Sequence, residues 1–371
     1  MTIEEKVYLL VGAGTSATDL EAAIIGQTRK LVPGAAGTTF PIARLGIPAI
    51  VFADGPAGLR ISPTRDSTDQ TFYATQFPIG TQLAATWDTA MVRRIGNAIG
   101  NEVHEYGVDV ILGPGMNLQR NPLNGRNFEY YSEDPLLTGK ISVAMVKGIQ
   151  QKQVGVSIKH FAANNQETNR LNNSSIVDPR TLREMYLRPF EIVVKEADPW
   201  TIMSSYNKIN GEFAAERTDL LTTVLRDEWG FDGFVVSDWC SMVEMINHGF
   251  AADRKDVARL SANAGLDMEM VSQTYVDYLP ELIAENKVSI DVIDNAVRNI
   301  LRIKYRLGLF ENPYVDEVET STISSDEHLQ TARQAATESA ILLKNNGVLP
   351  LKENKTVAII GPMAHAPYDQ L

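Results

Sequence analysis

The feature that most constrains this fold is the alternation of short apolar runs with amphipathic helical stretches. Six runs read as strands: 49–54, 108–115, 154–161, 201–207, 233–239 and 264–270. Their continuous apolar character indicates strands buried on both faces, as in parallel sheets. Strand and helix in regular succession predict an α/β protein with a (β/α)8 TIM-type barrel over residues 1–315. A doubly wound open sheet is the alternative.

The predicted helices have recognisable ends. Asp178 with Pro179 is a cap followed by proline at the first helical position, and a helix from Asp88 to Tyr106 should end before Gly107.

One early motif invites a different interpretation. Residues 12–17, "GAGTSA", match the dinucleotide fingerprint GxGxxG/A. That motif must follow a strand, whereas Thr2 and Glu5 form a capping box that starts a helix. Arg29 and Lys30 also stand near the place where the ribose-binding acid is needed. We therefore reject nucleotide binding.

Composition excludes several classes of partner. The net charge of -12 repels nucleic acid and anionic membrane surfaces. Cys240 is the single cysteine and the five histidines are far apart in the sequence, so we expect no disulfide, no metal site and no cofactor. No run approaches membrane-spanning length, and the start "MTIEEKVYLL" does not resemble a signal peptide. We expect a cytoplasmic protein, or a periplasmic or secreted one if a leader has been removed.

Polar side chains gather where the predicted strands end. In a (β/α) barrel these ends lie on one rim, where the chemistry takes place. The residues concerned are Asp54, Lys159, His160, Tyr206, Asn207, Asp238, Trp239 and Glu269.

Asp238 is the strongest catalytic candidate among them. An Asp at a strand-to-helix turn is most often a helix cap. However, Ser241 and Glu244 form their own SxxE capping box, which should leave Asp238 free to act as acid, base or nucleophile.

The other candidates have structural interpretations that remain open. Lys159 and His160 could be a solvated lysine and a core histidine, and Tyr206 and Trp239 could be core aromatics. Arg126 could belong to a surface ion-pair network with the acidic residues that follow it.

Four motifs in register resemble glycoside hydrolase family three, in its β-glucosidase branch. They are "ADGPAGLR", "GRNFEYYSEDP", "KHFAANNQETNR" and "GFVVSDW". The resemblance implies that Asp238 is the catalytic nucleophile of a retaining β-glucosidase acting on terminal non-reducing glucosyl residues. It also implies that the terminal sugar is bound by Asp54, Arg60, Arg126, Lys159 and His160, while Tyr206 and Trp239 flank the reacting centre.

A retaining glycosidase needs a second carboxylic acid to protonate the leaving group. "KHFAANNQETNR" has no second histidine, unlike the hexosaminidase branch, and the resemblance implies a glutamate from a second domain. We expect a linker over 316–355 and the first strand of an α/β sandwich domain over 356–371, with the acid beyond Leu371. If the acid lies in the barrel, Glu269 and Glu167 are the first candidates.

Two rival functions belong to other classes. Lys159 at a strand end could be the amine of a Schiff-base lyase, although Asp238 would then have no role. The chain could also bind a glycoside without turning it over.

Overall fold

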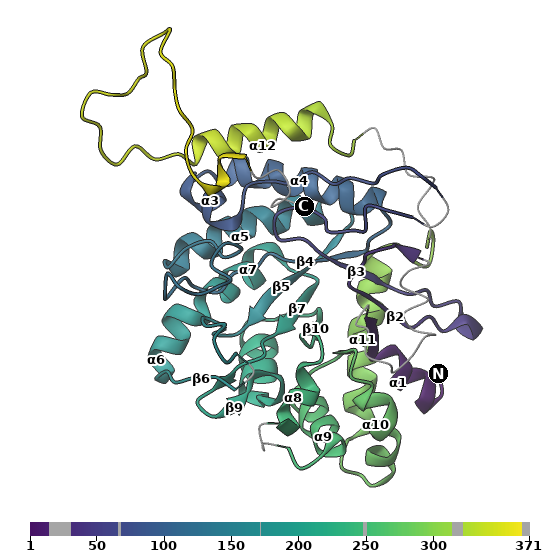
Figure 1. Ribbon diagram of the computed structural model, residues 1–371. Helices are drawn as coiled ribbons and strands as arrows, with labels where there is room; N and C mark the ends of the chain where they lie inside the picture. Colours follow the sequence, from purple (N-terminus) through teal and green to yellow (C-terminus); the bar gives the residue numbers. More distant parts are fainter. Residues whose placement is uncertain (15–30, 66–67, 171, 248–250, 314–321, 366–371) are drawn as a thin grey trace.

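The computed structural model describes residues 1–14, 31–65, 68–170, 172–247, 251–313 and 322–365. Eight strands form one sheet in the order β10-β7-β5-β4-β3-β2-β1-β11. Their bounds are β1 Val11–Gly14, β2 Gly37–Thr39, β3 Val51–Asp54, β4 Val110–Leu112, β5 Gly155–Phe161, β7 Thr201–Ser204, β10 Phe234–Val236 and β11 Glu269–Met270. The Ser237 amide donates to the Met268 carbonyl at 2.8 Å, which joins β10 to the chain entering β11 and closes the barrel. The predicted TIM-type barrel is confirmed (Figure 1).

The barrel departs from eight regular βα units at β1 and β2. All six predicted runs contain parallel strands, but β1 and β2 were not predicted. β2 runs antiparallel to both of its neighbours, β1 and β3. Gly12 and Gly14 lie within β1, not in a turn after a strand, so the nucleotide-binding arrangement is not formed there. Residues 15–17, Arg29 and Lys30 lie outside the described residues.

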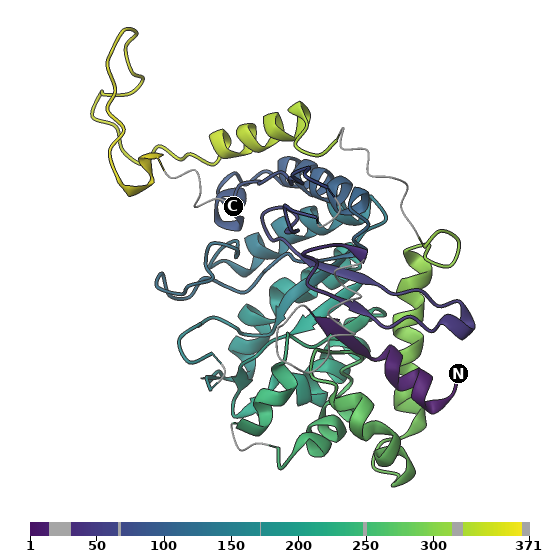
Figure 2. The same ribbon diagram turned by 45° about the vertical axis from the view of Figure 1, so that its right-hand side comes forward.

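Helices surround the sheet (Figures 1 and 2). They are α1 Ile3–Leu9, α3 Gly80–Ala85, α4 Thr89–Glu105, α5 Pro135–Gln150, α6 Pro179–Thr181, α7 Arg188–Ala197, α8 Ser241–Asn247, α9 Arg254–Ala264, α10 Thr274–Ala284, α11 Ile290–Arg306 and α12 Asp326–Glu338. Segments of 3-10 and π-helix cover Ala43–Leu45, Leu182–Tyr186, Ala214–Glu216, Asp219–Glu228 and Pro362–His365. A small second sheet joins β6 Ser174–Ser175, β8 Lys208–Ile209 and β9 Glu212–Phe213.

Helix capping follows the sequence at three predicted starts. Thr2 and Glu5 form the reciprocal capping box of α1, Asp88 caps α4, and Asp178 caps α6 ahead of Pro179. These side chains satisfy backbone N–H groups that a helix cannot pair internally.

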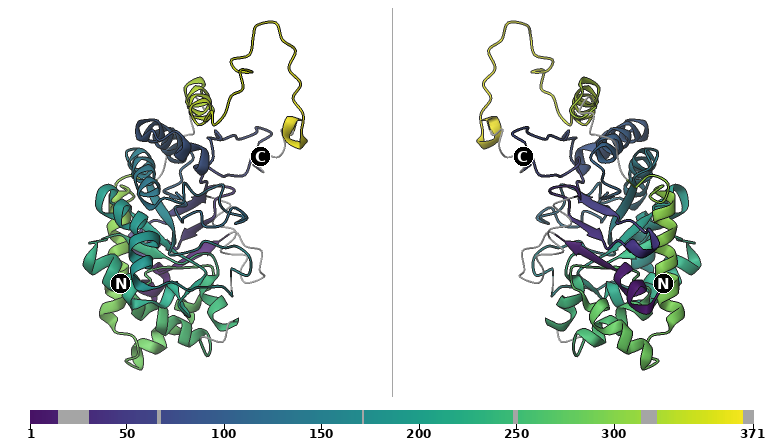
Figure 3. Two further views of the ribbon diagram at one scale, coloured as in Figure 1. Left: turned by 90° about the vertical axis from the view of Figure 1, so that its left-hand side faces the viewer. Right: turned by 90° about the vertical axis from the view of Figure 1, so that its right-hand side faces the viewer.

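The segment after the barrel contains more structure than a linker. Helix α12 lies within the range predicted as linker and packs against α4 and α3 (Figure 1). Beyond it, residues 340–365 project away from the barrel (Figure 3). Val357, Ile359 and Ile360 are exposed, and 356–360 pairs with no strand among the described residues. The boundaries predicted for the linker and the second domain remain predictions. Among the described helices, none has the length and apolarity to span a bilayer.

Candidate active site

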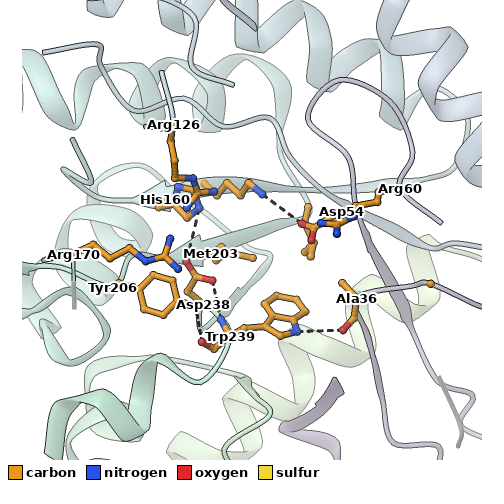
Figure 4. Close-up of a pocket in the computed structure, with 13 residues that line it drawn as sticks. Ala36, Asp54, Arg60, Arg126, His160, Arg170, Met203, Tyr206, Asp238 and Trp239 are labelled. Carbon is orange, nitrogen blue, oxygen red and sulfur yellow. Dashed lines mark hydrogen bonds and ion pairs between the residues drawn. The ribbon is translucent and has the colours of Figure 1, made fainter. Parts of the chain in front are cut away.

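A pocket of about 360 Å³ opens at the rim where the parallel strands end (Figure 4). The eight residues to which the family resemblance gave a role all line it: Asp54, Arg60, Arg126, Lys159, His160, Tyr206, Asp238 and Trp239. They come from the ends of β3 and β5 and from segments that follow β3, β4, β7 and β10. Of the strand-end candidates, Asn207 and Glu269 do not line it. The volume falls in the range of small-molecule sites.

Asp238 is buried two residues after β10. Its Oδ1 accepts a hydrogen bond from the Trp239 amide at 2.8 Å, while its buried Oδ2 has no hydrogen-bond partner among the described residues. Burial raises the pKa of Asp238 to about 6, against the opposing effects of Arg126, the Trp239 amide, Lys159 and Arg170. At neutral pH the carboxylate is therefore mostly ionised, with an oxygen available for chemistry.

The capping box predicted for Ser241 and Glu244 is wrong. Ser241 does not cap α8: it is the first residue of that helix, and its Oγ has no hydrogen-bond partner among the described residues. Asp238 itself supports the turn through its backbone carbonyl, which accepts from the Ser241 amide at 3.1 Å. Among the described residues, Oδ2 of Asp238 is unpartnered because the backbone carbonyl of Asp238, and not its carboxylate, supports the start of α8.

Two cations of the pocket are held by carboxylates. Lys159 Nζ lies 3.6 Å from Asp54 Oδ1 and 3.9 Å from Glu129 Oε2, and Arg126 pairs through Nε with the other oxygen of Glu129. Glu129 is buried and does not line the pocket. The ion pairs of Arg126 are thus part of a buried network, not a surface one. Such charge-assisted contacts fix the donors in place.

His160 faces Asp238 as a neutral imidazole. Its Nε2 lies 3.8 Å from Asp238 Oδ2, and its backbone N–H donates to Asn117 Oδ1 at 2.9 Å. Burial, followed by the charges of Arg126 and Lys159, holds the pKa of His160 well below its usual range. The contact is therefore between a carboxylate and a neutral ring, and not a true ion pair.

Two aromatic residues form another wall of the pocket (Figure 4). The Tyr206 hydroxyl donates to the Trp239 carbonyl at 2.6 Å, and Trp239 Nε1 donates to the Ala36 carbonyl at 3.2 Å. The guanidinium of Arg170 lies 4.6 Å from the centre of the Tyr206 ring. Because both rings are tied down by their polar atoms, the indole is held in a fixed orientation beside Asp238.

Five lining residues were not singled out from the sequence: Gly34, Ala36, Leu112, Arg170 and Met203. Arg170 closes the motif "KHFAANNQETNR" but lies nine residues beyond the end of β5, so no strand-end rule marks it. Leu112 and Met203 read as ordinary core residues. Gly34 and Ala36 come from the chain entering β2, and only the antiparallel direction of that strand brings them to the pocket.

The two other acids considered from the sequence are engaged elsewhere. Glu269 is fully buried and accepts from Ser272 Oγ at 2.5 Å and from the Tyr275 amide at 2.7 Å, near the start of α10. Glu167 pairs with Arg170 at 2.8 Å. Neither lines the pocket. Over the described ranges, no group of three or more His, Cys, Asp or Glu side chains is placed to hold a metal ion.

Comparisons with known proteins give the family of the chain. The family model described as the glycosyl hydrolase family 3 N terminal domain matches residues 27–303. Thermostable beta-glucosidase B of Acetivibrio thermocellus is 43% identical over 339 residues, covering 89% of this chain and 42% of that protein. An exo-alpha-(1->6)-L-arabinopyranosidase of Bifidobacterium longum is 40% identical over 338 residues, covering 87% and 42%.

A solved structure gives the same result. Beta-glucosidase 3B from Thermotoga neapolitana, in complex with alpha-D-glucose, superposes with a TM-score of 0.83 at 43% identity, over 95% of this chain and 48% of that one. The chain thus spans about two fifths of the length of the curated relatives it matches. With the family model covering most of the sequence and the barrel shared, this chain belongs to glycosyl hydrolase family 3 and carries its N-terminal domain.

Proposed function

We propose that this chain is the nucleophile-bearing part of a retaining, exo-acting β-glycosidase that removes terminal non-reducing β-D-glucosyl residues. The observation that carries the proposal is Asp238: a buried carboxylate with one unpartnered oxygen, facing a pocket lined by cations and an indole. That is the arrangement a covalent glycosidase needs for its nucleophile. The beta-glucosidase relative and neighbour support the sugar class.

In the first step, Asp238 Oδ2 attacks the anomeric carbon while the bond to the leaving oxygen breaks. A glycosyl ester forms on Asp238, and the leaving oxygen takes a proton from a general acid. In the second step, water attacks the anomeric carbon, its proton passes to that same group, and the Asp238 carboxylate is released. The sugar leaves with its anomeric configuration retained.

The pocket cations have a double role in this scheme. Arg126, Lys159 and Arg170 each lower the pKa of Asp238 against its burial, and so keep it ionised at neutral pH. They also present N–H donors to sugar hydroxyls, while Asp54 accepts hydroxyl protons. The paired ammonium of Lys159, between two carboxylates, suits a hydroxyl donor better than the free amine of a lyase.

The general acid is proposed to come from outside the described pocket. Among the described residues, the carboxylates that line the pocket are Asp54 and Asp238, and Asp54 is beside Lys159. A glutamate of a second domain in the longer parent protein is the candidate. This places the pocket mouth at a junction between two domains.

A trapping experiment tests the proposal without needing the acid. A 2-fluoro-β-glucoside with a dinitrophenolate leaving group needs no acid, because dinitrophenolate departs without protonation. Its 2-fluoroglucosyl group should therefore form an ester on the peptide containing "VVSDWC". Asp238→Asn is the control that should remain unlabelled. Azide, which needs no base, should speed turnover of dinitrophenyl β-glucoside. A label on Glu269 or Asp54 would refute the assignment, and binding of a glucose-like inhibitor without any labelling would favour a sugar-binding role.

A further inference from the structure

Helix α12 is joined to the pocket by a buried polar chain on the outer side of the barrel. Its centre is Glu102 in α4, a carboxylate with no exposed surface that the mechanism does not use. Thr75 donates to Glu102 through both its amide, at 2.7 Å, and its hydroxyl. His328 in α12 contacts the same carboxylate through Nδ1 at 2.7 Å.

The contacts of Glu102 determine its protonation and the direction of these hydrogen bonds. Burial acts to raise the pKa of the Glu102 carboxyl, but hydrogen bonds from His328 and Thr75 outweigh it, and the pKa lies below its usual range. An ionised carboxylate can only accept hydrogen bonds. Nδ1 of His328 is therefore a donor, and both His328 and Thr75 donate hydrogen bonds to the Glu102 carboxylate.

Thr75 in turn supports the turn that carries Arg60. That turn begins at Asp54, the last residue of β3, and the Arg60 amide donates to the Asp54 carbonyl at 2.9 Å. Gly58 packs so closely that a Cβ on it would lie 2.2 Å from the Thr75 carbonyl oxygen. The Phe77 amide donates to the Ala57 carbonyl at 2.8 Å. Residues 75–77 are thus the backing against which the Asp54–Arg60 turn is folded.

Contacts before and within α12 strengthen the link. The Ser324 amide donates to Glu102 at 3.3 Å, and the Thr322 hydroxyl donates to Glu105 on the same helix. The rings of His328 and Phe77 lie 6.2 Å apart. Figures 1 and 2 show α12 lying along α4. The first turn of α12 therefore contacts both the carboxylate and the backing segment.

We propose that Glu102 and His328 are positioning residues that set the Asp54–Arg60 turn, so that the docking of α12 on the barrel controls one wall of the sugar pocket. They touch no substrate and act through Thr75 and Gly58. Arg60 is exposed and has no ion pair among those identified in the described residues, so the turn's backbone must supply its position. The polypeptide that leaves the barrel through α12 is in this way coupled to sugar binding, a consequence that rests on the proposed function.

Three variants of the full chain test the link. His328→Ala removes the donor, His328→Asn keeps an N–H close to the position of Nδ1, and Gln334→Ala changes an exposed residue of the same helix. Hydrogen exchange is followed at residues 55–62, in α12, and in α9 as a reporter of global unfolding. Loss of a hydrogen bond to a charged acceptor should speed exchange at 55–62 about tenfold or more in His328→Ala. The other two variants should stay near wild type.

Calorimetric binding of deoxynojirimycin, a glucose-shaped cation, measures the effect on the pocket. His328→Ala should bind it about threefold or more weakly, and His328→Asn should recover most of the affinity. Faster exchange confined to α12, with 55–62 and inhibitor affinity unchanged, would overturn the inference. Faster exchange at 55–62 with unchanged affinity would overturn the control of the pocket.

A failure of the proposed function would look different, because the wild-type chain itself would then bind no inhibitor. The exchange comparison would still decide whether α12 sets the Asp54–Arg60 turn: acceleration at 55–62 supports that part of the inference, and its absence refutes the inference.

Discussion

Asp238→Asn should abolish trapping and also make the folded chain more stable at neutral pH. Burial raises the pKa of Asp238 from 3.8 to about 6 in the folded state. Folding therefore carries a cost for ionising this group, equal to the difference between the two pKa values at 1.36 kcal/mol per unit. The cost is roughly 3 kcal/mol at pH 7.5. The Asn side chain has the same shape and does not ionise, so this cost is absent in Asp238→Asn.

The stability difference between Asp238→Asn and the wild type should depend on pH. A carboxyl whose folded pKa is raised destabilises the native state fully above about pH 6, and the cost fades as the pH falls toward 3.8. Urea unfolding of wild type and Asp238→Asn should differ by about 3 kcal/mol at pH 7.5 and by well under 1 kcal/mol near pH 4. Asp69→Asn, the same substitution at an exposed position, provides the matched control.

Two results would contradict this reasoning. A variant no more stable than wild type at pH 7.5 would mean that the cations around Asp238 offset its burial completely. A stability gain that stays constant from pH 4 to pH 7.5 would mean that it comes from packing and not from ionisation.

Two further predictions concern the groups around Asp238. Arg126 lowers the pKa of Asp238, and Glu129 compensates the charge of Arg126. The acid limb of the pH profile of the trapping rate, expected near pH 6, should therefore shift in opposite directions in the two neutral variants. It should move upward by about one pH unit in Arg126→Gln and downward by less in Glu129→Gln. Shifts of the same sign in the pH profile would indicate a general structural defect. Tyr206→Phe leaves the Trp239 carbonyl without its 2.6 Å donor and should cost about 1 to 2 kcal/mol of unfolding free energy and weaken deoxynojirimycin binding; unchanged calorimetric affinity would mean that Trp239 is held by other contacts.

Six of the strands were predictable because each lies in an apolar run, and five of these runs give way to polar residues, as the run containing β5 does at Lys159 and His160. The pair β1 and β2 could not be predicted in the same way. β1 contains two glycines, and β2 is the three-residue run Gly37–Thr39, so both exist through pairing with neighbours and not through their own pattern. Local sequence carries no record of such tertiary pairing.

The site shows the same division. Strand ends and family motifs pointed to eight pocket residues, because in a parallel barrel those ends share one rim. Arg170 was missed, since its place above the Tyr206 ring depends on the path of a long loop. The Ser241 capping box failed because the SxxE pattern does not specify which residue is the first of α8.

The two glycines of the Asp54–Arg60 turn bear on how variation in this family is interpreted. Gly55 and Gly58 have φ values of 149° and 128°, and a Cβ at these positions would lie 1.9 Å and 2.2 Å from carbonyl oxygens. Any side chain there is strained and lacks space. A saturation library scored by activity would therefore rank both glycines as intolerant as Asp238, although neither takes part in chemistry. Only a parallel abundance screen would separate positions that maintain the turn from the proposed nucleophile.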